Sequence, residues 1–120
     1  MRVLVIDDQE DSALLLYELA KACGWESRFC TISTRAVSIA REWQPHVILL
    51  DLAMPGIDGY QLAPLLRAAC EDTLSLLVAV SGYRREPEKL FAARIAGHLL
   101  KPVRLEQLRQ LLESAAALVH

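Results

Sequence analysis

An uninterrupted apolar run, Val47 to Leu50, constrains the fold of this chain more than any other feature. Such a run predicts a strand that is buried on both faces, as in a parallel sheet covered by helices. The run ends at Asp51, and a loop rich in turn formers follows: Met54, Pro55, Gly56, Asp58 and Gly59. Because open α/β sheets place their chemistry at the carboxyl ends of their strands, Asp51 is a candidate site residue. The alternative is that it only ends the strand and caps a turn.

The size and composition predict one globular domain over residues 1–120. A chain of 120 residues with 53% hydrophobic and 23% charged residues can build a single core and is not expected to be disordered. The net charge of −2 gives no electrostatic reason to expect nucleic acid or an anionic membrane as a partner. No apolar run approaches the roughly 20 residues that span a bilayer.

The cysteines bear on the cellular compartment. There are three, Cys23, Cys30 and Cys70, with no CxxC pair among them. An odd count without such a pair argues against a disulfide framework or a zinc site. We therefore expect reduced thiols in a cytosolic protein.

Strand and helix patterns alternate five times along the chain. The expected strands cover residues 2–6, 25–29, 47–51, 76–80 and 99–100. The expected helices run through about Cys23, over 31–43, over 60–69, from Pro87 to a stop at Gly97, and over 105–118. Pro64 cannot donate to the carbonyl of Tyr60, so we expect the third helix to start late or to kink. The alternation predicts an α/β fold, a doubly wound, flavodoxin-like parallel sheet of order 2-1-3-4-5 with five helices on its two faces.

The first helix is predicted to be amphipathic. Its expected apolar stripe consists of Leu14, Leu15, Tyr17, Leu19 and Ala22. Asp11 and Ser12 can cap its start, and Gly24 suits the position just past its end.

Polar residues stand at four strand ends that are otherwise apolar. Asp7 and Asp8 end the first strand, Asp51 the third, Ser81 the fourth and Lys101 the fifth. All lie at one edge of the predicted sheet, which is hard to attribute to turn capping alone. Three crowded carboxylates repel one another, and Mg²⁺ relieves that repulsion while keeping room for a phosphoryl oxygen.

This cluster can support phosphoryl transfer onto a carboxylate. A carboxylate next to the metal can attack phosphorus and become an aspartyl phosphate. Metal and lysine would neutralise the charge on the equatorial oxygens, and the Ser81 hydroxyl could donate to one of them. We assign Asp51 as the acceptor because it stands alone on the middle strand.

Four separated motifs resemble the receiver domain of two-component response regulators: DD at 7–8, LLDLAMPGIDG at 49–59, VSGY at 80–83 and KP at 101–102. The resemblance covers essentially the whole chain. It implies that Asp51 takes a phosphoryl group from a histidine kinase or a histidine phosphotransfer domain with Mg²⁺, and loses it by hydrolysis. The domain would thus be a signalling phosphoacceptor and not an enzyme with a separate substrate.

The resemblance also assigns roles to single residues. Asp8 would bind the metal directly together with Asp51 and the backbone carbonyl of Ala53, and Asp7 would act through bound water. Lys101 would pair with the phosphoryl group and precede a cis proline. Ser81 and the residue three before the lysine, here His98, would form the conformational switch. The alternative for His98 is an ordinary, satisfied histidine at the sheet edge.

The expected interaction surfaces also follow from the resemblance. The phosphodonor would dock near Leu14 and Leu15, although these leucines could be plain core. The fourth helix, fifth strand and fifth helix would form the output or homodimer face, with nearby arginines that could equally be solvated: Arg84, Arg85, Arg94, Arg104 and Arg109. His98 and the VSGY motif look more like receivers of hybrid sensor kinases than like receivers that precede DNA-binding domains. We expect the chain to be either a stand-alone receiver or part of a longer protein.

Three rival functions remain. The first is a receiver-like protein-binding module that works without phosphorylation. The second is a small phosphatase with an aspartyl intermediate, although the first strand ends in DDQ and offers no DxD, and no cap domain is expected. The third, a nucleotide-binding fold, lacks a glycine-rich phosphate loop after the first strand.

Overall fold

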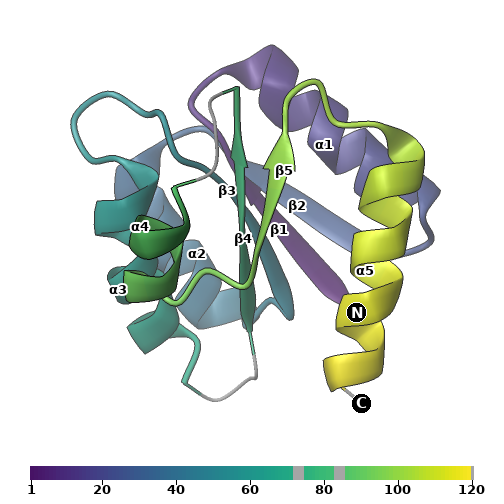
Figure 1. Ribbon diagram of the computed structural model, residues 1–120. Helices are drawn as coiled ribbons and strands as arrows, with labels where there is room; N and C mark the ends of the chain where they lie inside the picture. The colour runs from purple at the N-terminus through teal and green to yellow at the C-terminus, as the bar shows by residue number, and fades with distance from the viewer. Residues whose placement is uncertain (72–74, 83–85, 120) are drawn as a thin grey trace.

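Five parallel strands form one sheet in the order β2-β1-β3-β4-β5 (Figure 1). The computed structural model describes residues 1–71, 75–82 and 86–119. The strands are β1 (Arg2–Ile6), β2 (Glu26–Cys30), β3 (Val47–Asp51), β4 (Leu76–Ser81) and β5 (Gly97–Leu100). The helices are α1 (Glu10–Ala22), α2 (Ser33–Trp43), α3 (Gly59–Ala69), α4 (Pro87–Ala92) and α5 (Leu105–Val119). The predicted fold class is confirmed.

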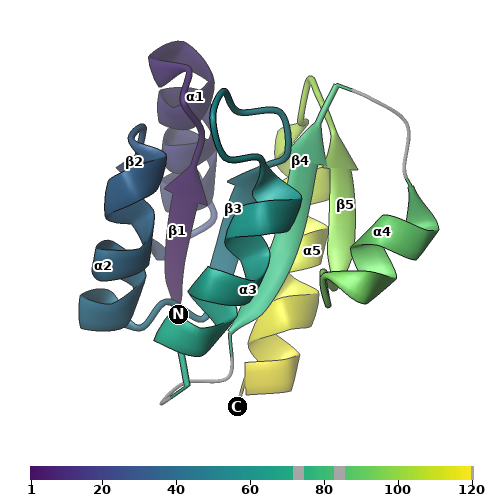
Figure 2. The same ribbon diagram turned by 90° about the vertical axis from the view of Figure 1, so that its left-hand side faces the viewer.

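Helices cover both faces of the sheet, which explains the unbroken apolar strands. α1 and α5 lie on one face, and α2, α3 and α4 on the other (Figures 1 and 2). Alternate residues of β3 enter the two cores: Val47 and Leu49 pack with α1 and α5, and Ile48 and Leu50 with the opposite layer. Every residue of β3, including Asp51, is buried. Both faces therefore select apolar side chains, and the strand has no solvated side that would call for alternation.

The predicted N-cap of α1 is wrong, and its predicted apolar stripe is wrong in part, although Leu19 does pack against the core. The helix buries Ala13, Leu16 and Ala20, whereas Leu14 is 42% and Leu15 51% exposed. Small alanines allow the helix to approach the sheet closely, so its inner face is not the one richest in leucine. The N-cap is Gln9, without a side-chain cap, so neither Asp11 nor Ser12 holds that position. Gly24 has φ 91°, as expected just past a helix end.

α3 begins at Gly59, one residue before the expected start, so the predicted late start is wrong. Asp58 accepts the backbone N–H of Gln61, and the Gln61 side chain accepts the N–H of Asp58. This capping box holds the first turn in spite of the hydrogen bond that Pro64 cannot make. The alternative expectation, a kink at Pro64, stays a prediction.

α4 starts at Pro87 as predicted but ends at Ala92, well before Gly97. Arg94, with φ 56°, turns the chain, and the Ile95 N–H donates to the carbonyl of Leu90. Gly97 is the first residue of β5 and not a helix stop. In the described part of the chain, no helix is both long and apolar enough to cross a bilayer.

Candidate functional site

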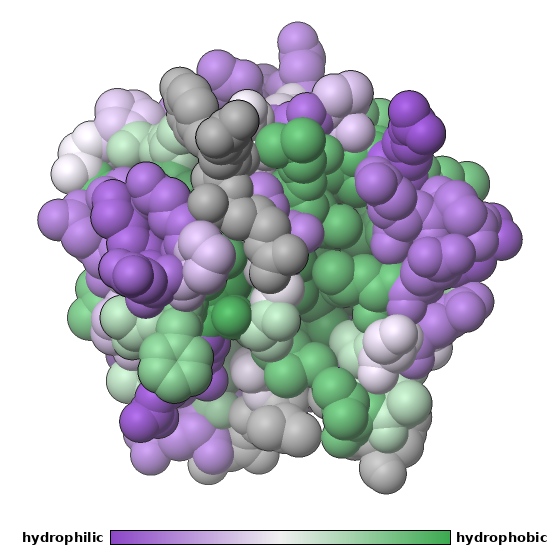
Figure 3. Space-filling view, viewed as in Figure 1, coloured by the Kyte–Doolittle hydropathy of each residue, from purple (hydrophilic) through white to green (hydrophobic). Residues whose placement is uncertain are grey.

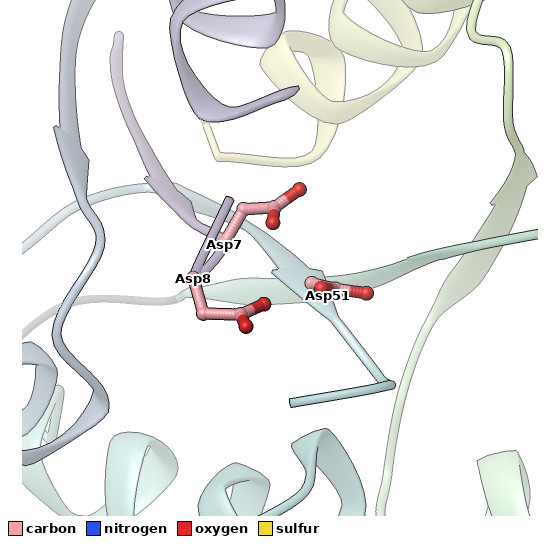
Figure 4. A group of neighbouring side chains, drawn as sticks. All are labelled: Asp7, Asp8 and Asp51. Carbon is pink, nitrogen blue, oxygen red and sulfur yellow. The ribbon is translucent and has the colours of Figure 1, made fainter. Parts of the chain in front are cut away.

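The carboxyl ends of β1, β3, β4 and β5 bring the predicted polar residues to one edge of the sheet. Asp7 and Asp8 follow β1, and Asp51 is the last residue of β3. The three carboxylates point toward the same space (Figure 4), and one oxygen of each lies within 4.8 Å of the others. This convergence follows from parallel pairing, which places the last residues of neighbouring strands side by side.

Lys101 connects two of these carboxylates. Its Nζ lies 3.0 Å from Oδ2 of Asp7 and 3.8 Å from Oδ1 of Asp51. Asp7 is fully buried, and its other oxygen accepts the backbone N–H of Gln9 at 3.0 Å. Both oxygens of Asp7 thus have partners, which a charge without access to water requires.

Asp51 is held in an environment that disfavours its charged form. Its side chain is 5% exposed, and Oδ1 accepts the backbone N–H of Ala53 at 3.2 Å. Burial, and next the negative charge of Asp7, raise the pKa of Asp51 to about 6, against the opposing effects of the Ala53 N–H and Lys101. A positive charge added beside Asp51 would therefore stabilise its ionised form more than it would stabilise the ionised form of a carboxylate on the surface.

Asp8 supplies the observation that fits a cation. Its Oδ1 is buried and has no hydrogen-bond partner among the residues the structure describes. Within that same part of the chain, Lys101 is the one cation paired with these acids, so three ionised carboxylates would leave two negative charges at the site. Oxygen ligands and a charge of two are what Mg²⁺ requires, so the residues present fit this ion.

Ser81 and His98 are joined by a hydrogen bond. Ser81 is buried at the end of β4, and its Oγ lies 2.9 Å from Nε2 of His98 in the neighbouring strand β5. The pair therefore joins the end of β4 to the neighbouring strand β5. This hydrogen bond is compatible with both interpretations of His98. An ordinary histidine at the sheet edge would have such a partner, and a switch formed by Ser81 and His98 requires contact between the two side chains. The role of His98 stays a prediction.

A groove adjoins the acidic site on the α1 side. Its volume is about 450 Å³, and it is lined by Gln9, Asp11, Ser12, Leu15, Leu16, Lys101, Pro102 and Val103. The peptide bond between Lys101 and Pro102 is cis, as predicted. Since Leu14 and Leu15 are about half exposed, the alternative that they are plain core is wrong. An apolar wall thus lies beside the lysine of the site.

The face formed by α4, β5 and α5 is partly apolar. Figure 3 shows hydrophobic residues over β5, with hydrophilic residues on either side. Its exposed apolar side chains include Phe91, Leu100 and Leu118. Among the predicted arginines, Arg109 pairs with Glu106 at 3.3 Å, whereas Arg84 and Arg85 lie outside the described residues, as does Tyr83 of the VSGY motif.

Two residues that shape the site are not among the predicted site residues. The backbone of Gln9 binds Asp7, and Gly59 packs against the peptide after Asp51. Nothing in the sequence marks Gln9, because a backbone N–H carries no signature of its own. Gly59 falls in the predicted loop, although the spacing of Asp58 and Gln61 is a capping-box signal that marks a helix start here.

Comparisons with known proteins agree with this geometry. The family model described as "Response regulator receiver domain" matches residues 3–113. The virulence sensor protein BvgS of Bordetella pertussis is 31% identical over 98% of this chain, which spans 10% of that protein. The two-component response regulator ORR21 of Oryza sativa subsp. indica is 30% identical over 92% of this chain, which spans 16% of it.

A smaller relative and two solved structures extend the comparison. Protein PilH of Pseudomonas aeruginosa is 26% identical, with 97% of this chain and 98% of PilH covered. The chemotaxis protein CheY4 of Vibrio cholerae superposes with a TM-score of 0.86 at 19% identity, covering 95% and 97% of the two chains. A receiver domain from Methylobacillus flagellatus gives 0.86 at 24% identity, covering 96% and 98%. These low identities establish the likeness in fold alone.

Proposed function

Because this chain belongs to the response regulator receiver domain family, we propose that Asp51 accepts a phosphoryl group from a phosphohistidine. Receiver domains are signalling phosphoacceptors, and they interact with histidine kinases or phosphotransfer proteins. The observation that carries the proposal is a buried Asp51 carboxylate beside both an ammonium and an acid with an unpartnered buried oxygen.

The transfer is a direct displacement at phosphorus. An oxygen of Asp51 attacks, a new O–P bond forms, and the P–N bond to the donor imidazole breaks, with the electron pair returning to that nitrogen. Hydrolysis later cleaves the acyl phosphate, releases inorganic phosphate and restores the carboxylate. The chain catalyses only these two steps on its own side chain, and it acts on no other substrate.

Receiver domains generally bind Mg²⁺ at an acidic pocket, and we propose that this one does. Asp8, Asp51 and the backbone carbonyl of Ala53 would hold the ion, with Asp7 acting through water. The ion would supply positive charge for the phosphoryl oxygens. Lys101, now 3.0 Å from Asp7 and 3.8 Å from Asp51, would move toward the phosphoryl group and stabilise its negative charge.

The groove beside the site is our proposed dock for the phosphohistidine protein. Leu15, which is 51% exposed, lines this groove together with Lys101, Pro102 and Val103. Leu14 adds exposed apolar surface on the same helix. Exposed apolar surface at the rim of a charged site suits a transient protein partner. Docking there would bring a donor side chain to Asp51 along the groove.

We propose that Ser81 and His98 transmit phosphorylation to the face of α4, β5 and α5. The Ser81 hydroxyl would donate to the phosphoryl oxygen and release Nε2 of His98, which lies 2.9 Å away. The ring could then reorient at β5. The apolar surface of this face, with Phe91 and Leu100, would bind an output partner or a second copy of the chain.

The cellular setting is part of the proposal as well. The three cysteines of the chain, Cys23, Cys30 and Cys70, are free thiols. This supports, together with the phosphohistidine donor, the expectation of a cytoplasmic protein, either stand-alone or within a hybrid sensor kinase.

The test is incorporation of phosphate from phosphoramidate, whose P–N bond mimics phosphohistidine. With Mg²⁺, we expect one acid-stable, base-labile phosphate per chain, mapped to Asp51 by mass spectrometry and absent in Asp51→Asn. Asp58→Asn is the matched control, because asparagine caps a helix as well as aspartate does. No incorporation by the unaltered chain would refute phosphotransfer. A partner that binds Asp51→Asn as tightly as the phosphorylated protein would instead favour a phosphorylation-independent binding module.

A further inference from the structure

Gly59 lies against the backbone of the residue that carries the site. The chain leaves β3 at Asp51, forms a loop and returns at the start of α3 (Figure 2), where the Gly59 N–H donates to the carbonyl of Leu52 at 3.1 Å. A Cβ added at Gly59 would lie 2.7 Å from the carbonyl oxygen of Asp51. It would also lie 2.8 Å from Cα and 2.8 Å from Cδ2 of Leu52. Two of these three atoms are backbone, so a change of rotamer cannot relieve the contact.

Neither side of this contact is free to move. Asp51 pairs with Val80 in β4, and the Leu52 N–H donates to the Val80 carbonyl at 3.3 Å. On the helix side, the capping box of Asp58 sets the first turn of α3, and the helix buries further residues in the core, among them Leu62, Ala63 and Leu66. A displacement must therefore disturb either the packed helix or the end of β3.

Helix propensity and packing predict opposite effects of alanine here. In a helix, alanine is favoured over glycine by about 1 kcal/mol, so propensity alone would make Gly59→Ala neutral or stabilising. Forcing an extra carbon into a packed site costs about 1–3 kcal/mol and shifts the backbone. Contact near 3.4 Å is ordinary, so the gap to Asp51 must widen by about 0.7 Å. The contact outweighs propensity at this position.

We infer that Gly59 is a positioning residue, which sets where the Asp51 carboxylate and the Ala53 backbone stand relative to Asp8. The inference rests on the proposed function. Leu52 is the only residue between Asp51 and Ala53, so a shift of its backbone displaces both groups together. A displacement of this size at a site of fixed geometry costs on the order of 10- to 100-fold in rate.

The experiment compares Gly59→Ala with Gly97→Ala. At Gly97 in β5 an added Cβ would have its nearest neighbour, Cδ1 of Leu111, at 3.7 Å, which is an ordinary contact. For Gly59→Ala we expect a Mg²⁺ dissociation constant raised by about 10-fold in isothermal titration calorimetry, and slower phosphate incorporation from phosphoramidate by about 10-fold or more. Gly97→Ala should stay within about twofold of the unaltered chain in both.

Two further measurements separate positioning from stability. In the metal-free protein, the amide resonances of Leu52 and Ala53 should shift in Gly59→Ala, a change that a mere loss of folding free energy does not produce. The double variant Leu52→Ala/Gly59→Ala removes the side-chain contact but keeps both backbone contacts, and it replaces the single variant if that fails to fold. The double variant should show the same loss of Mg²⁺ affinity and of phosphate incorporation rate as Gly59→Ala.

Two outcomes would overturn the inference. One is a Mg²⁺ affinity of Gly59→Ala within about twofold of the unaltered protein, and the other is full recovery of affinity and rate in the double variant. If the unaltered chain takes up no phosphate, the proposed function fails. The Mg²⁺ titration and the amide shifts would still decide the role of Gly59.

Discussion

Replacing Asp51, the proposed phosphoacceptor, by asparagine should stabilise the metal-free protein at neutral pH. The folded state raises the pKa of Asp51 from 3.8 to about 6, because the carboxylate is buried and close to Asp7. Folding thus favours the protonated acid. The associated stabilisation is fully present below about pH 3.8 and is lost as the pH rises through about 6. The amide side chain that Asp51→Asn introduces cannot ionise, has nearly the same shape, and can still accept the Ala53 N–H.

The magnitude follows from linkage. Raising the pKa of Asp51 from 3.8 to about 6 corresponds to about 3 kcal/mol, which is the full cost of ionising this carboxyl in the folded state. Most of this cost already applies at mildly acidic pH, since an unfolded carboxyl ionises there. Between about pH 5 and pH 8, the stability of Asp51→Asn relative to the unaltered chain should therefore increase by about 1.4 kcal/mol.

The assay is urea unfolding with EDTA, followed by the fluorescence of Trp25 and Trp43. The free energy of unfolding of both proteins is measured at pH 5, 6, 7 and 8, and the difference is plotted against pH. At pH 8, saturating Mg²⁺ should make the unaltered chain more stable than Asp51→Asn, because Mg²⁺ binding stabilises the folded state of the unaltered chain more than that of the variant. A difference that stays constant with pH, or a variant that is less stable at pH 8 without metal, would refute the assigned environment of Asp51.

Three further variants test other contacts of the site. Lys101→Ala should slow phosphate incorporation from phosphoramidate at least 10-fold, and it should lower the free energy of unfolding by about 2 kcal/mol because Asp7 loses its buried ion pair; unchanged stability in urea would contradict this. Leu15→Glu should reduce transfer from a phosphohistidine protein about 10-fold while leaving phosphoramidate labelling unchanged, and equal losses in both assays would exclude a docking role. His98→Phe removes the partner of the Ser81 hydroxyl, so we expect labelling to persist while the phosphorylation-dependent change in the amide spectrum of β5 is lost; a preserved change would show that His98 is not the switch.

The strand order and the edge of the sheet that carries the polar residues could be predicted from the sequence alone. Buried parallel strands require apolar residues on both faces, so the runs at β1, β3 and β4 predicted their own burial and hence the layers of helices. Parallel strands also end at the same edge, so Asp51, Ser81 and Lys101 had to meet there. This inference needs only the strand order and no knowledge of side-chain packing.

Which side chains contact one another depends on how the helices pack on the sheet, and the sequence pattern does not report this. α1 turns Ala13, Leu16 and Ala20 toward the sheet, so Leu14 and Leu15 are surface residues although their apolar character predicts a core position. The bond between Ser81 and His98 depends on the register of β4 against β5.

The same holds for long-range contacts and for glycine. Lys101 pairs with Asp7, 94 positions away in the sequence. The two residues meet because Lys101 follows β5 and Asp7 follows β1, and both strands end at the same edge of the sheet. Gly59 carries no functional atoms, and its effect arises from the space it leaves beside the Asp51 and Leu52 backbone. Periodicity and residue type report which surfaces are apolar, whereas contacts of this kind depend on distances that exist only after the layers have packed.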